Sequence, residues 1–595
     1  MRVQLAQQAQ EILGTSDLVM ITERVDDVAL LIGQMVTMGL PEVLDRHIPR
    51  HWTQRGLSWG WTAVIWLAYI LTEGDHRKVS METYLKGMHH TLSRLTAQVI
   101  EPLDLSDDRL SHRLQHVSKP AYWHAIERDL NERSIEVYDL SQGVSRCDAT
   151  TVSGDHEVTE EGLVQFGHSK DDPTRPQSKV MIGSLDPLGM PLATDVLSGE
   201  RADDGLYIPI MERIRTGLKT TGLLFVGDCK MSALETRAYL ARHQDFYLSP
   251  LPLTGATAEA MDAWITEGVT QGERGALARI VRPNDRGHQV LVAEGYECER
   301  TCDAPGDAVD AAAWHERVLV VRSPMHADQQ AAGLETRLCH AETKLAALTP
   351  PRGRGKRHIT DEATLLEAID RVLTEHRVDG LLSVTWEPQV EQTTQYVGRG
   401  RGSVHREKRV RQKTRSHITH IARQADTIAA LRQRFGWKAF VTNAAPKRLS
   451  WQEAVLCYRN EYRVERIFNR LKSRVHIAPL FVKLNDQIEG LTYLLTLGVR
   501  VLTVMEFVLR RSLQTDQTKL PGLHPEHKTK MTDKPTAERI LKAFADVSLT
   551  IIKHAAGEEI LRRLTPLSGL QEDILQRLGL GASLYGQLEI QEMGN

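Results

Sequence analysis

The chain has 595 residues, a length that predicts about three or four domains rather than one hydrophobic core. Its 74 Lys and Arg nearly balance its 77 Asp and Glu, so net charge excludes no partner, although basic residues gather in the second half. Six scattered cysteines argue against a disulfide framework and favour a reducing cytoplasm. The most apolar runs, 59–71 and 491–509, are short or interrupted by Arg500, so we expect buried helices and no membrane span.

Residues 1–138 show the apolar spacing of helices. Within them, the stretch 105–130 predicts two short helices separated by a Ser-Lys-Pro turn at 118–120. Such a pair is compatible with a helix-turn-helix module that contacts DNA, and equally with ordinary helical scaffolding. We therefore expect a helical N-terminal region whose role stays open between these two.

From residue 139 onward the pattern changes to short strands. The segments RCDATTVS, LVQFGHS, KVMIGSLD and MPLATDVL are rich in β-branched and aromatic residues, and the sequence DPLG at 186–189 predicts a hairpin between the last two. A helix over 203–217, a strand over 222–228, a helix over 231–243 and a strand over 245–251 are expected next. Strands first and helix–strand alternation afterwards indicate a mixed sheet covered by helices.

The stretch 255–435 is less regular, with strand-like segments, a charged helix near 360–377 and basic glycine-rich linkers, and we interpret it as an insertion. Regular structure resumes with a strand over 438–443, a long helix over 450–473 and an apolar helix near 486–511. A polar linker and a small helical unit are expected over the final 80 or so residues.

The segment 458–474, YRNEYRVERIFNRLKSR, mixes three kinds of side chain. Projected as an α-helix at about 100° per residue, it gives an apolar face, an arginine face, and a third face with Tyr458, Glu465 and Lys472. A row of like charges disfavours a helix, so we expect either the phosphates of a nucleic acid along it or neighbouring carboxylates that neutralise a solvated face. The arginine face holds Arg459, Arg463, Arg466, Arg470 and Arg474.

Glu465 and Lys472 place a carboxylate that can hold a metal beside an ammonium that can hold a phosphate. Because Mg²⁺ prefers several oxygen ligands, further acidic residues must converge on such a site. The candidates are Asp148, within RCDATTVS, and Asp228, which ends the strand LLFVGD where α/β sheets collect ligands. For either aspartate taken alone, a helix cap or turn residue is the plain alternative.

Together these residues resemble the DDE transposases of bacterial insertion sequences. In the insertion-sequence-four-like branch the third acid sits in the pattern Y-x-x-R-x-x-x-E-x-x-x-x-x-x-K, which Tyr458, Glu465 and Lys472 match. Glu461 stands where the family has its arginine and is a rival third acid, but the spacing to the lysine favours Glu465. CDATTVS with FGHSKDD resembles the first-acid strand and its Gly-x-Ser-Lys loop, VLSGERADD resembles the G-N-x-x-D segment, and VGDCKMS resembles the second-acid strand.

The resemblance covers about residues 140–510 and implies an α/β fold, a ribonuclease-H-like mixed sheet with flanking helices. A β-containing insertion splits this core, and helical N- and C-terminal regions flank it. The regions expected are 1–138 (helical, DNA-end-binding), 139–254 (core, first part), 255–435 (insertion), 436–512 (core, second part) and 513–595 (linker and helical unit).

The function that the resemblance implies is cleavage of phosphodiester bonds at the ends of an insertion sequence and joining of the 3′-hydroxyl ends to target DNA. Asp148, Asp228 and Glu465 would hold two Mg²⁺ ions for in-line displacement, with Mn²⁺ as a substitute. The expected partners are double-stranded DNA, namely terminal inverted repeats and target, and a second copy of the chain in a homodimer. No G-x-x-x-x-G-K-[ST] loop occurs, so no nucleotide cofactor is expected. The location implied is the bacterial cytoplasm, at the nucleoid when DNA is bound.

Further DNA contacts are expected outside the three acids. Trp386 is a candidate to stack on a flipped base, with an ordinary packed tryptophan as the alternative. The basic stretches 351–358 and 397–417 fit phosphates, or else form solvated linkers. The expected contacts are Tyr458, Lys472, the five arginines of the arginine face, Lys170, Trp386, Arg399, Arg401, Arg409 and Arg411.

Two other functions remain open. The first is a ribonuclease-H-like nuclease or resolvase that cuts DNA without strand transfer. The second is a catalytically inactive DNA-binding derivative, against which the presence of all three acids argues.

Overall fold

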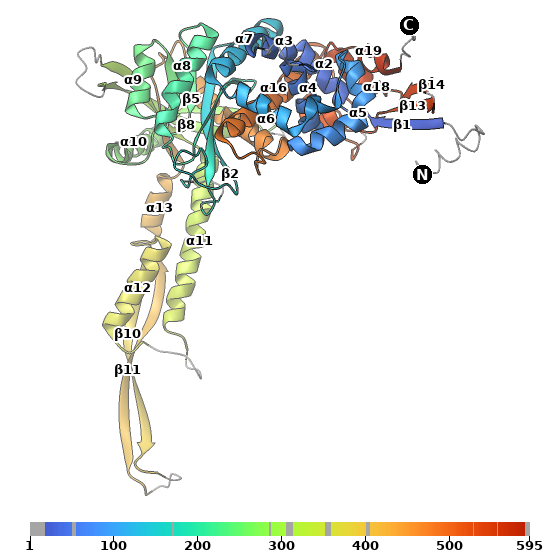
Figure 1. Cartoon of the computed structure of the whole chain (residues 1–595). Coiled ribbons are helices and arrows are strands. Elements are labelled where there is room, and N and C mark those ends of the chain that lie inside the picture. Colours follow the sequence, from blue (N-terminus) through green and yellow to red (C-terminus); the bar gives the residue numbers. More distant parts are fainter. Residues whose placement is uncertain are drawn as a thin grey trace. The chain divides into compact units, whose positions relative to one another are not determined.

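The computed structural model of the chain describes residues 18–49, 55–168, 172–284, 287–304, 313–351, 359–399, 405–527, 529–555 and 557–589 (Figure 1). Its internal contacts divide it into two units. Unit 1 comprises Met1–Ser249, Asp303–Trp314 and Leu456–Asn595, and unit 2 comprises Pro250–Cys302 and His315–Val455. The stretch expected as an insertion, 255–435, belongs to unit 2 apart from 303–314.

Unit 1 contains a mixed sheet with the strand order β4-β3-β2-β5-β6. β2, β3 and β4 pair antiparallel, whereas β5 pairs parallel with both β2 and β6. The predicted hairpin is confirmed, because residues 186–189 join β3 to β4 and Gly189 adopts a φ of 74° that favours glycine. The strands are β2 (Val144–Ser153), β3 (Gln177–Leu185), β4 (Met190–Ser198), β5 (Leu224–Gly227) and β6 (Phe246–Pro250).

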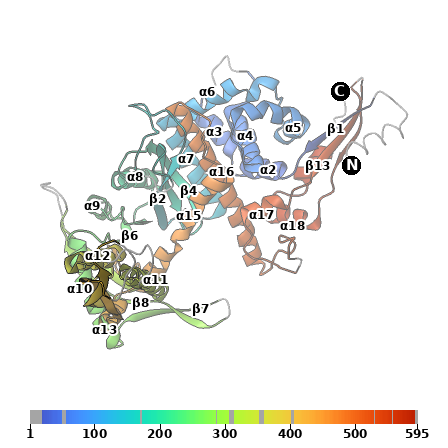
Figure 2. The same ribbon diagram turned by 90° about the horizontal axis from the view of Figure 1, so that it is seen from below.

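Helices cover both faces of this sheet, and β3 is buried along its whole length (Figure 2). α8 (Tyr207–Leu218) lies on the face to which Cys147 points, since a Cβ on the neighbouring Gly183 would meet Ile214 of α8 at 2.3 Å. Because side chains alternate along a strand, Arg146 and Asp148 face the opposite side, where α15 (Tyr462–Asn469) contacts β2. α9 (Leu234–Arg242) follows β5, so both helices predicted between the strands are confirmed.

α16 (Asn485–Thr515) contacts the N-terminal helices α2, α4 and α6 as well as β4, and α7 contacts β4 directly (Figure 2). Two of the N-terminal helices, α6 and α7, confirm the predicted pair, with Pro120 at the first position of α7. Trp123 of α7 donates through Nε1 to the Thr194 carbonyl at 3.3 Å and stacks on Tyr493 of α16, so α7 is part of the core. The helices are α2 (Val28–Thr37), α3 (Leu40–His47), α4 (Trp59–Glu73), α5 (Met81–Thr96), α6 (Asp107–Val117) and α7 (Pro120–Tyr138).

Among the described residues, α16 is the one single helix long and apolar enough to cross a membrane. Of its most apolar window, 89% is buried inside the molecule, as is typical of a core helix. The bent pair α2 and α3 passes the same test only when both are taken together. Arg500, in the middle of α16, is buried and donates to the Asn131 side chain and the Pro191 carbonyl, which ties the helix to α7 and β4.

The contact between α7 and β4 buries a carboxyl group. Glu127 accepts a hydrogen bond from the Thr194 amide at 2.8 Å and lies 3.3 Å from Arg213, yet burial raises its pKa from an ordinary 4.5 to about 8. Since the folded state holds this proton more tightly than the unfolded state, stability should fall as pH rises from 4.5 through about 8. In urea unfolding, the free energy of unfolding of Glu127→Gln should depend less on pH between 4.5 and about 8 than that of the wild type. An equal pH dependence in both proteins would contradict this assignment.

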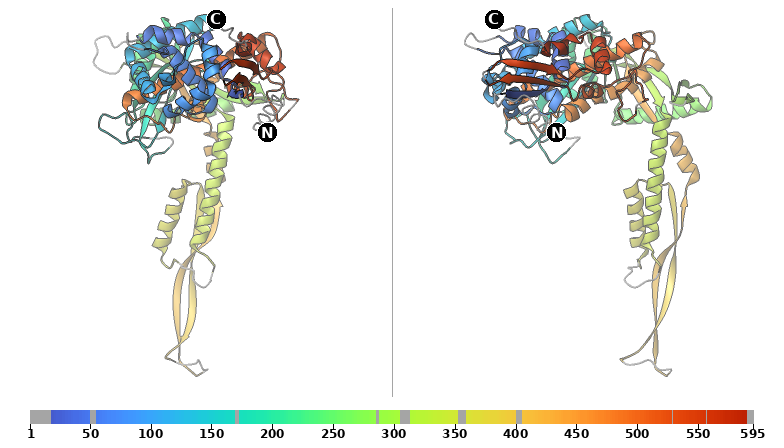
Figure 3. Two further views of the ribbon diagram at one scale, coloured as in Figure 1. Left: turned by 45° about the vertical axis from the view of Figure 1, so that its right-hand side comes forward. Right: turned by 90° about the vertical axis from the view of Figure 1, so that its right-hand side faces the viewer.

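The chain's N-terminal strand pairs with its C-terminal region, in a sheet of order β1-β13-β14 (Figure 3, right). β1 pairs antiparallel with β13 from Leu18↔His554 to Arg24↔Ser548. The expectation of a purely helical C-terminal unit is therefore wrong, because Leu549 and Ile551 alternate into a core that β1 completes. The elements are β1 (Leu18–Arg24), α17 (Ala537–Lys542), β13 (Ser548–His554), β14 (Glu559–Leu564), α18 (Gly569–Arg577) and α19 (Ser583–Gly586).

The helix expected over 450–473 is interrupted. α14 (Trp451–Tyr458) ends in a 3₁₀ turn (Arg459–Glu461), α15 follows, and a π turn (Arg470–Arg474) closes the segment. The prediction of one continuous α-helix, and of faces set by a uniform rotation per residue, is therefore wrong. Within this segment, Arg463 pairs with Asp186 and Arg470 pairs with Glu506, so both arginines are tied to other elements.

In unit 2, four strands pair in the order β12-β9-β8-β7, with β9 antiparallel to β12 and β7 antiparallel to β8. Three helices and a long hairpin, β10–β11, form a further part with its own core, made by residues such as Leu338, Leu345, Ile369 and Ile418. The elements are α10 (Ala256–Glu273), β7 (Ala278–Pro283), β8 (Gln289–Cys302), β9 (Trp314–Arg322), α11 (Pro324–Leu348), α12 (Glu362–His376), β10 (Leu382–Tyr396), β11 (Lys408–Arg423), α13 (Ala425–Gln433) and β12 (Trp437–Thr442).

Candidate functional site

Two of the predicted acids lie side by side in unit 1. In the parallel register of β2 and β5, Cys147 is the partner of Gly227, so Asp148 and Asp228 are the next residues on neighbouring strands. Adjacent strands are about 4.8 Å apart, which brings the two carboxyl groups within reach of one ligand. Both aspartates line one small pocket, together with Arg146, Tyr458 and Val464.

Gly227 allows the chain to turn directly after β5. A Cβ at this position would meet the Met231 sulfur at 2.7 Å and the Cys147 carbonyl at 3.0 Å, so only glycine lets the turn fold back against β2. Asp228 begins that turn, and its Oδ1 accepts a hydrogen bond from the Lys230 amide at 2.9 Å. The turn fixes the carboxylate at the edge of the pocket.

Tyr207, the first residue of α8, is a positioning residue that the sequence did not suggest. Its hydroxyl donates to Asp228 Oδ1 at 2.6 Å. Burial raises the pKa of Tyr207 well above its usual range, and the negative charges of Asp228 and Asp148 raise it further, so the hydroxyl stays a donor. With Oδ1 taken by two donors, Oδ2 of Asp228 accepts no hydrogen bond from the described residues and is left for a ligand.

Removing the Tyr207 hydroxyl should loosen Asp228. For Tyr207→Phe we expect a stability loss of about 1 kcal/mol and a fall in Mg²⁺ affinity of about 10-fold, because partners that orient ligating carboxylates have effects of that size. Tyr585→Phe is the matched control, since this buried tyrosine of α19 donates to the Asp26 carbonyl at 2.7 Å. The control should lose similar stability in urea unfolding and keep its Mg²⁺ affinity. Equal Mg²⁺ affinity in both variants would remove Tyr207 from the site.

An ion-pair bridge fastens the segment of the third acid to β2. Asp186 lies 3.1 Å from Arg146 of β2 and 3.0 Å from Arg463 of α15. Arg146 also donates to the Cys457 carbonyl at the end of α14. Because Arg146 is two residues before Asp148 on the same face of the strand, the bridge sets α15 beside the acids.

Glu465 is placed next to this pocket but outside its lining. It follows Val464, which lines the pocket, and occupies an exposed position of α15. Within the described ranges, no group of three His, Cys, Asp or Glu side chains lies close enough to hold a metal ion. The side chain of Glu461, the rival third acid, lies outside the described residues. The structure thus brings together two of the three predicted acids, and the third stays a prediction.

The two aspartates fit a magnesium ion by the chemistry of their donors. Mg²⁺ is bound in proteins by one or two carboxylates and completes its octahedron with water and substrate phosphates. Asp148 and Asp228 supply two such carboxylates, and Oδ2 of Asp228 is available to a ligand.

Two motif glycines meet beyond the end of β2. A Cβ on Gly199 would lie 1.9 Å from the Gln177 carbonyl, and one on Gly167 would lie 2.3 Å from the Gly199 carbonyl. The segments FGHS and LSGE therefore pack backbone against backbone. The sequence predicts a strand at LVQFGHS. In the described part of that stretch, the structure instead forms an isolated β-bridge between Gln165 and Gln177.

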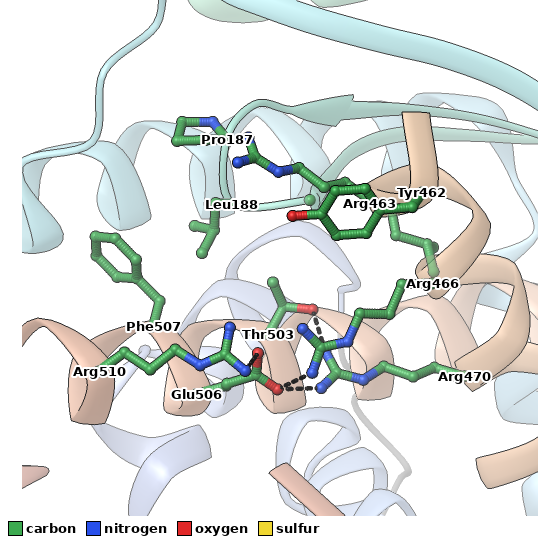
Figure 4. A pocket seen from close by; sticks show the side chains of 12 residues that line it. Pro187, Leu188, Tyr462, Arg463, Arg466, Arg470, Thr503, Glu506, Phe507 and Arg510 are labelled. Carbon is green, nitrogen blue, oxygen red and sulfur yellow. Dashed lines mark hydrogen bonds and ion pairs between the residues drawn. The ribbon is translucent and has the colours of Figure 1, made fainter. Parts of the chain in front are cut away.

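Much of the arginine face is neutralised by one buried carboxylate, Glu506 of α16 (Figure 4). Glu506 is 4% exposed and pairs with Arg466, with Arg470 and, at 2.7 Å, with Arg510. Burial lowers the pKa of Arg510, and the charges of Arg466 and Arg470 lower it further against the effect of Glu506. For Arg466 and Arg470, the expectation that neighbouring carboxylates neutralise the arginine face is therefore the one that the structure fits. The signal in the sequence was one glutamate within the apolar run LTVMEFVL.

The remaining residues of the broken helix differ in their surroundings. Arg470 also donates from Nε to Glu538 at 3.0 Å, and Arg474 donates to the Leu71 carbonyl at 2.6 Å. Arg459 is exposed in the 3₁₀ turn, Tyr458 lines the pocket of the two aspartates, and Lys472 is half-buried in the π turn. DNA contact by these residues stays a prediction.

The other expected DNA contacts are distributed over both units. Lys170 and Arg401 lie outside the described residues. Trp386 is half-buried against the core of unit 2 and donates to Glu362 at 3.2 Å, an arrangement that its packing alternative explains. Arg399, Arg409 and Arg411 are exposed on or beside the β10–β11 hairpin.

Comparisons with known proteins add little to this geometry. No family model matches the chain, and no curated protein matches its sequence. Among solved structures, the chain is similar to the piggyBac transposase synaptic complex with hairpin DNA, with a TM-score of 0.32 and 6% sequence identity, over 95% of this chain and 84% of that chain. A similarity this low carries no argument about fold or activity, so the branch expected from the motifs stays a prediction.

Proposed function

We propose that the chain is a metal-dependent DNA transposase with a ribonuclease-H-like core, which cuts DNA at the ends of an insertion sequence and joins the ends to a target. The observation that carries the proposal is that Asp148 and Asp228 line one pocket, each directly after a residue of the parallel pair Cys147 and Gly227. The strand order, with β2–β4 antiparallel and β5 and β6 parallel, fits the core that the motif resemblance implies. The segment with Tyr458, Glu465 and Lys472 lies against the same strand.

In the proposed mechanism the protein positions the acidic oxygens of Asp148 and Asp228. Asp148 and Asp228 would hold Mg²⁺, or Mn²⁺ in its place, and the bound ion supplies Lewis-acid stabilisation to the phosphodiester being displaced. Tyr207 and the Lys230 amide both donate to Oδ1 of Asp228, and these two hydrogen bonds fix the orientation of Oδ2. Tyr458 forms part of the pocket wall.

Glu465 would complete the acidic set when DNA is bound. α15 is bounded by a 3₁₀ turn on one side and a π turn on the other, and such breaks within helical segments mark functional hinges. A small change in these turns would bring Glu465 toward the pocket that Val464 already lines. The bridge from Arg463 to Asp186 would keep α15 on β2 during that change.

Excess positive charge beside α15 supports a phosphate partner. In two ion-pair groups, one around Asp186 and one around Glu506, five arginines share three carboxylates, so two positive charges are left over. Arg466 and Arg510 keep 35% and 29% of their side-chain surface exposed, which lets an anion reach them. The arginines are Arg146, Arg463, Arg466, Arg470 and Arg510, and the carboxylates are Asp186, Glu506 and Glu538.

The test uses purified full-length protein, labelled duplexes that carry the terminal repeats of the element, and a supercoiled target. With Mg²⁺ or Mn²⁺ we expect nicked ends and end-to-target joints, and with a chelator neither product. Cleavage without joints would favour the nuclease or resolvase. DNA binding without cleavage under any metal would favour the inactive derivative. Crosslinking of the same mixtures should give two subunits per pair of ends, as a homodimer requires.

A further inference from the structure

The β10–β11 hairpin of unit 2 forms a long two-stranded ribbon. Its pairing runs from Leu382↔Arg423 to Tyr396↔Lys408, with one irregularity between Thr385 and Trp386. Near Ile418 the ribbon packs on the core shared by α11 and α12. Beyond that point almost every residue of both strands is exposed, and no described element of unit 2 lies beside them (Figures 1 and 3).

The two faces of the ribbon differ in charge. Ile418 is buried and pairs with Trp386, so the face they share turns toward the core, and every second residue belongs to it. On the opposite face, four cations of β11 follow each other at every second position, across from polar residues of β10. This basic face consists of Arg409, Arg411, Lys413 and Arg415, with their partners Gln395, Thr393, Glu391 and Gln389.

Little on the ribbon neutralises these cations. Glu391, the carboxylate on the basic face, lies 3.3 Å from Arg415. Among the described residues, Arg409, Arg411 and Lys413 pair with no carboxylate. Over its outer part, β11 carries five cations from 408 to 415, against two carboxylates on β10 from 387 to 396. Neighbouring like charges destabilise an exposed ribbon that is marginal by itself, so this pattern favours an anionic partner.

The shape of the ribbon suits one kind of anion. A two-stranded ribbon fits the major groove of B-DNA, which is about 12 Å wide and is entered by ribbons in several DNA-binding folds. Cations at every second residue are spaced by about 6.6 Å and can follow the phosphates along the groove edge. Amide and hydroxyl side chains, such as Gln395 and Thr393, are groups that contact base edges there.

We propose that the basic face of the β10–β11 ribbon binds in the major groove of duplex DNA. Arg409, Arg411 and Lys413 contact phosphates, and Thr393 and Gln395 face the bases. The proposal rests on the proposed function for the choice of DNA as the partner, and it adds the place where unit 2 holds that DNA. The stretch 397–417, expected to fit phosphates or else to form a solvated linker, is in its strand part a docking surface for DNA.

The test compares two triple variants of the full-length protein on a duplex of fixed sequence. R409Q/R411Q/K413Q removes the three cations of the basic face, and the control R274Q/R282Q/K438Q removes three exposed cations elsewhere in unit 2. In titrations over a range of salt, the plot of log Kd against log salt should lose a slope of about 3 in the first variant, roughly one per phosphate contact. At about 0.1 M salt, its affinity should fall on the order of 100-fold. The control should match the wild type.

The groove is tested by chemical protection. Dimethyl sulfate modifies guanine N7, which lies in the major groove. The wild type and the control variant should protect a short run of guanines, and the basic-face variant should lose that protection. Equal salt slopes for all three proteins, or protection confined to the minor groove, would overturn the proposal.

Failure of this proposal can be separated from failure of the proposed function. If the basic-face variant binds like the wild type while the wild type still cleaves, the ribbon does not bind DNA and the transposase proposal stands. If the ribbon-dependent protection is present but no cleavage occurs with any metal, the ribbon binds DNA and the transposase proposal fails. Loss of self-association without loss of DNA affinity would show that the face takes a protein partner, and the proposal would be wrong.

Discussion

Replacing Asp228 by asparagine should reduce DNA cleavage by about a thousandfold or more while DNA affinity changes less than about threefold. The substitution keeps the side chain's size and a carbonyl oxygen to accept from Tyr207 and Lys230, but it removes the charge that would hold the metal. Phosphate contacts, which dominate affinity, are made elsewhere. Asp148→Asn should behave in the same way, because its carboxylate is the neighbour across the parallel strands.

Cleavage of a labelled end with Mg²⁺, followed over hours, measures this loss, and a binding assay on the same duplex measures affinity. Asp155→Asn is the control, since this exposed aspartate lies two residues beyond β2 and pairs with Arg175 at the surface. It should cleave like the wild type. Undiminished cleavage by Asp228→Asn would refute the assignment of the site.

Glu506→Gln should lower the stability of unit 1 by about 3 kcal/mol, because breaking a buried ion pair leaves its partners' charges uncompensated. Here three guanidinium groups, those of Arg466, Arg470 and Arg510, pair with this one carboxylate, and Arg470 also pairs with Glu538. Urea unfolding at pH 8 measures the loss. A variant as stable as the wild type would mean that these arginines find other partners.

Glu489→Gln, a second Glu-to-Gln substitution in α16, provides the control. Burial raises the pKa of Glu489 to about 7, so its charged form is disfavoured in the folded state. Since the folded pKa lies above the unfolded one, ionisation of Glu489 reduces stability as pH rises from 4.5 through about 7. At pH 8, Glu489→Gln should therefore leave stability unchanged or raise it, in contrast to Glu506→Gln.

The local part of the site follows from the sequence. Short β-branched segments and a DPLG turn predict β2, β3 and β4, and an aspartate at the end of an apolar strand predicts the position of Asp228. The register that makes Asp148 its neighbour is consistent with those patterns, because both acids stand at the same point relative to their strands.

The rest depends on contacts between residues far apart in the chain. α15 is tied down by ion pairs such as that of Arg463 with Asp186, 277 positions away, and helical periodicity predicts neither these pairs nor the breaks on either side of the helix. Tyr207 reaches Asp228 from another element, 21 positions away. Strand β13 pairs with β1, from a distant part of the sequence, as well as with β14, so the short alternation of β13 and β14 is weak evidence when read alone.

The pairing of β1 with β13 also has a consequence for biosynthesis. Tyr585 hydrogen-bonds the Leu30 amide across 555 positions, in the same part of unit 1 as that pairing. On the ribosome, which makes roughly 5–20 residues each second, the first strand must therefore wait about half a minute or more for its partner, with its edge exposed. Unit 1 can close only after Tyr585 has been made, so a chain that stops before this residue leaves an unpaired strand edge.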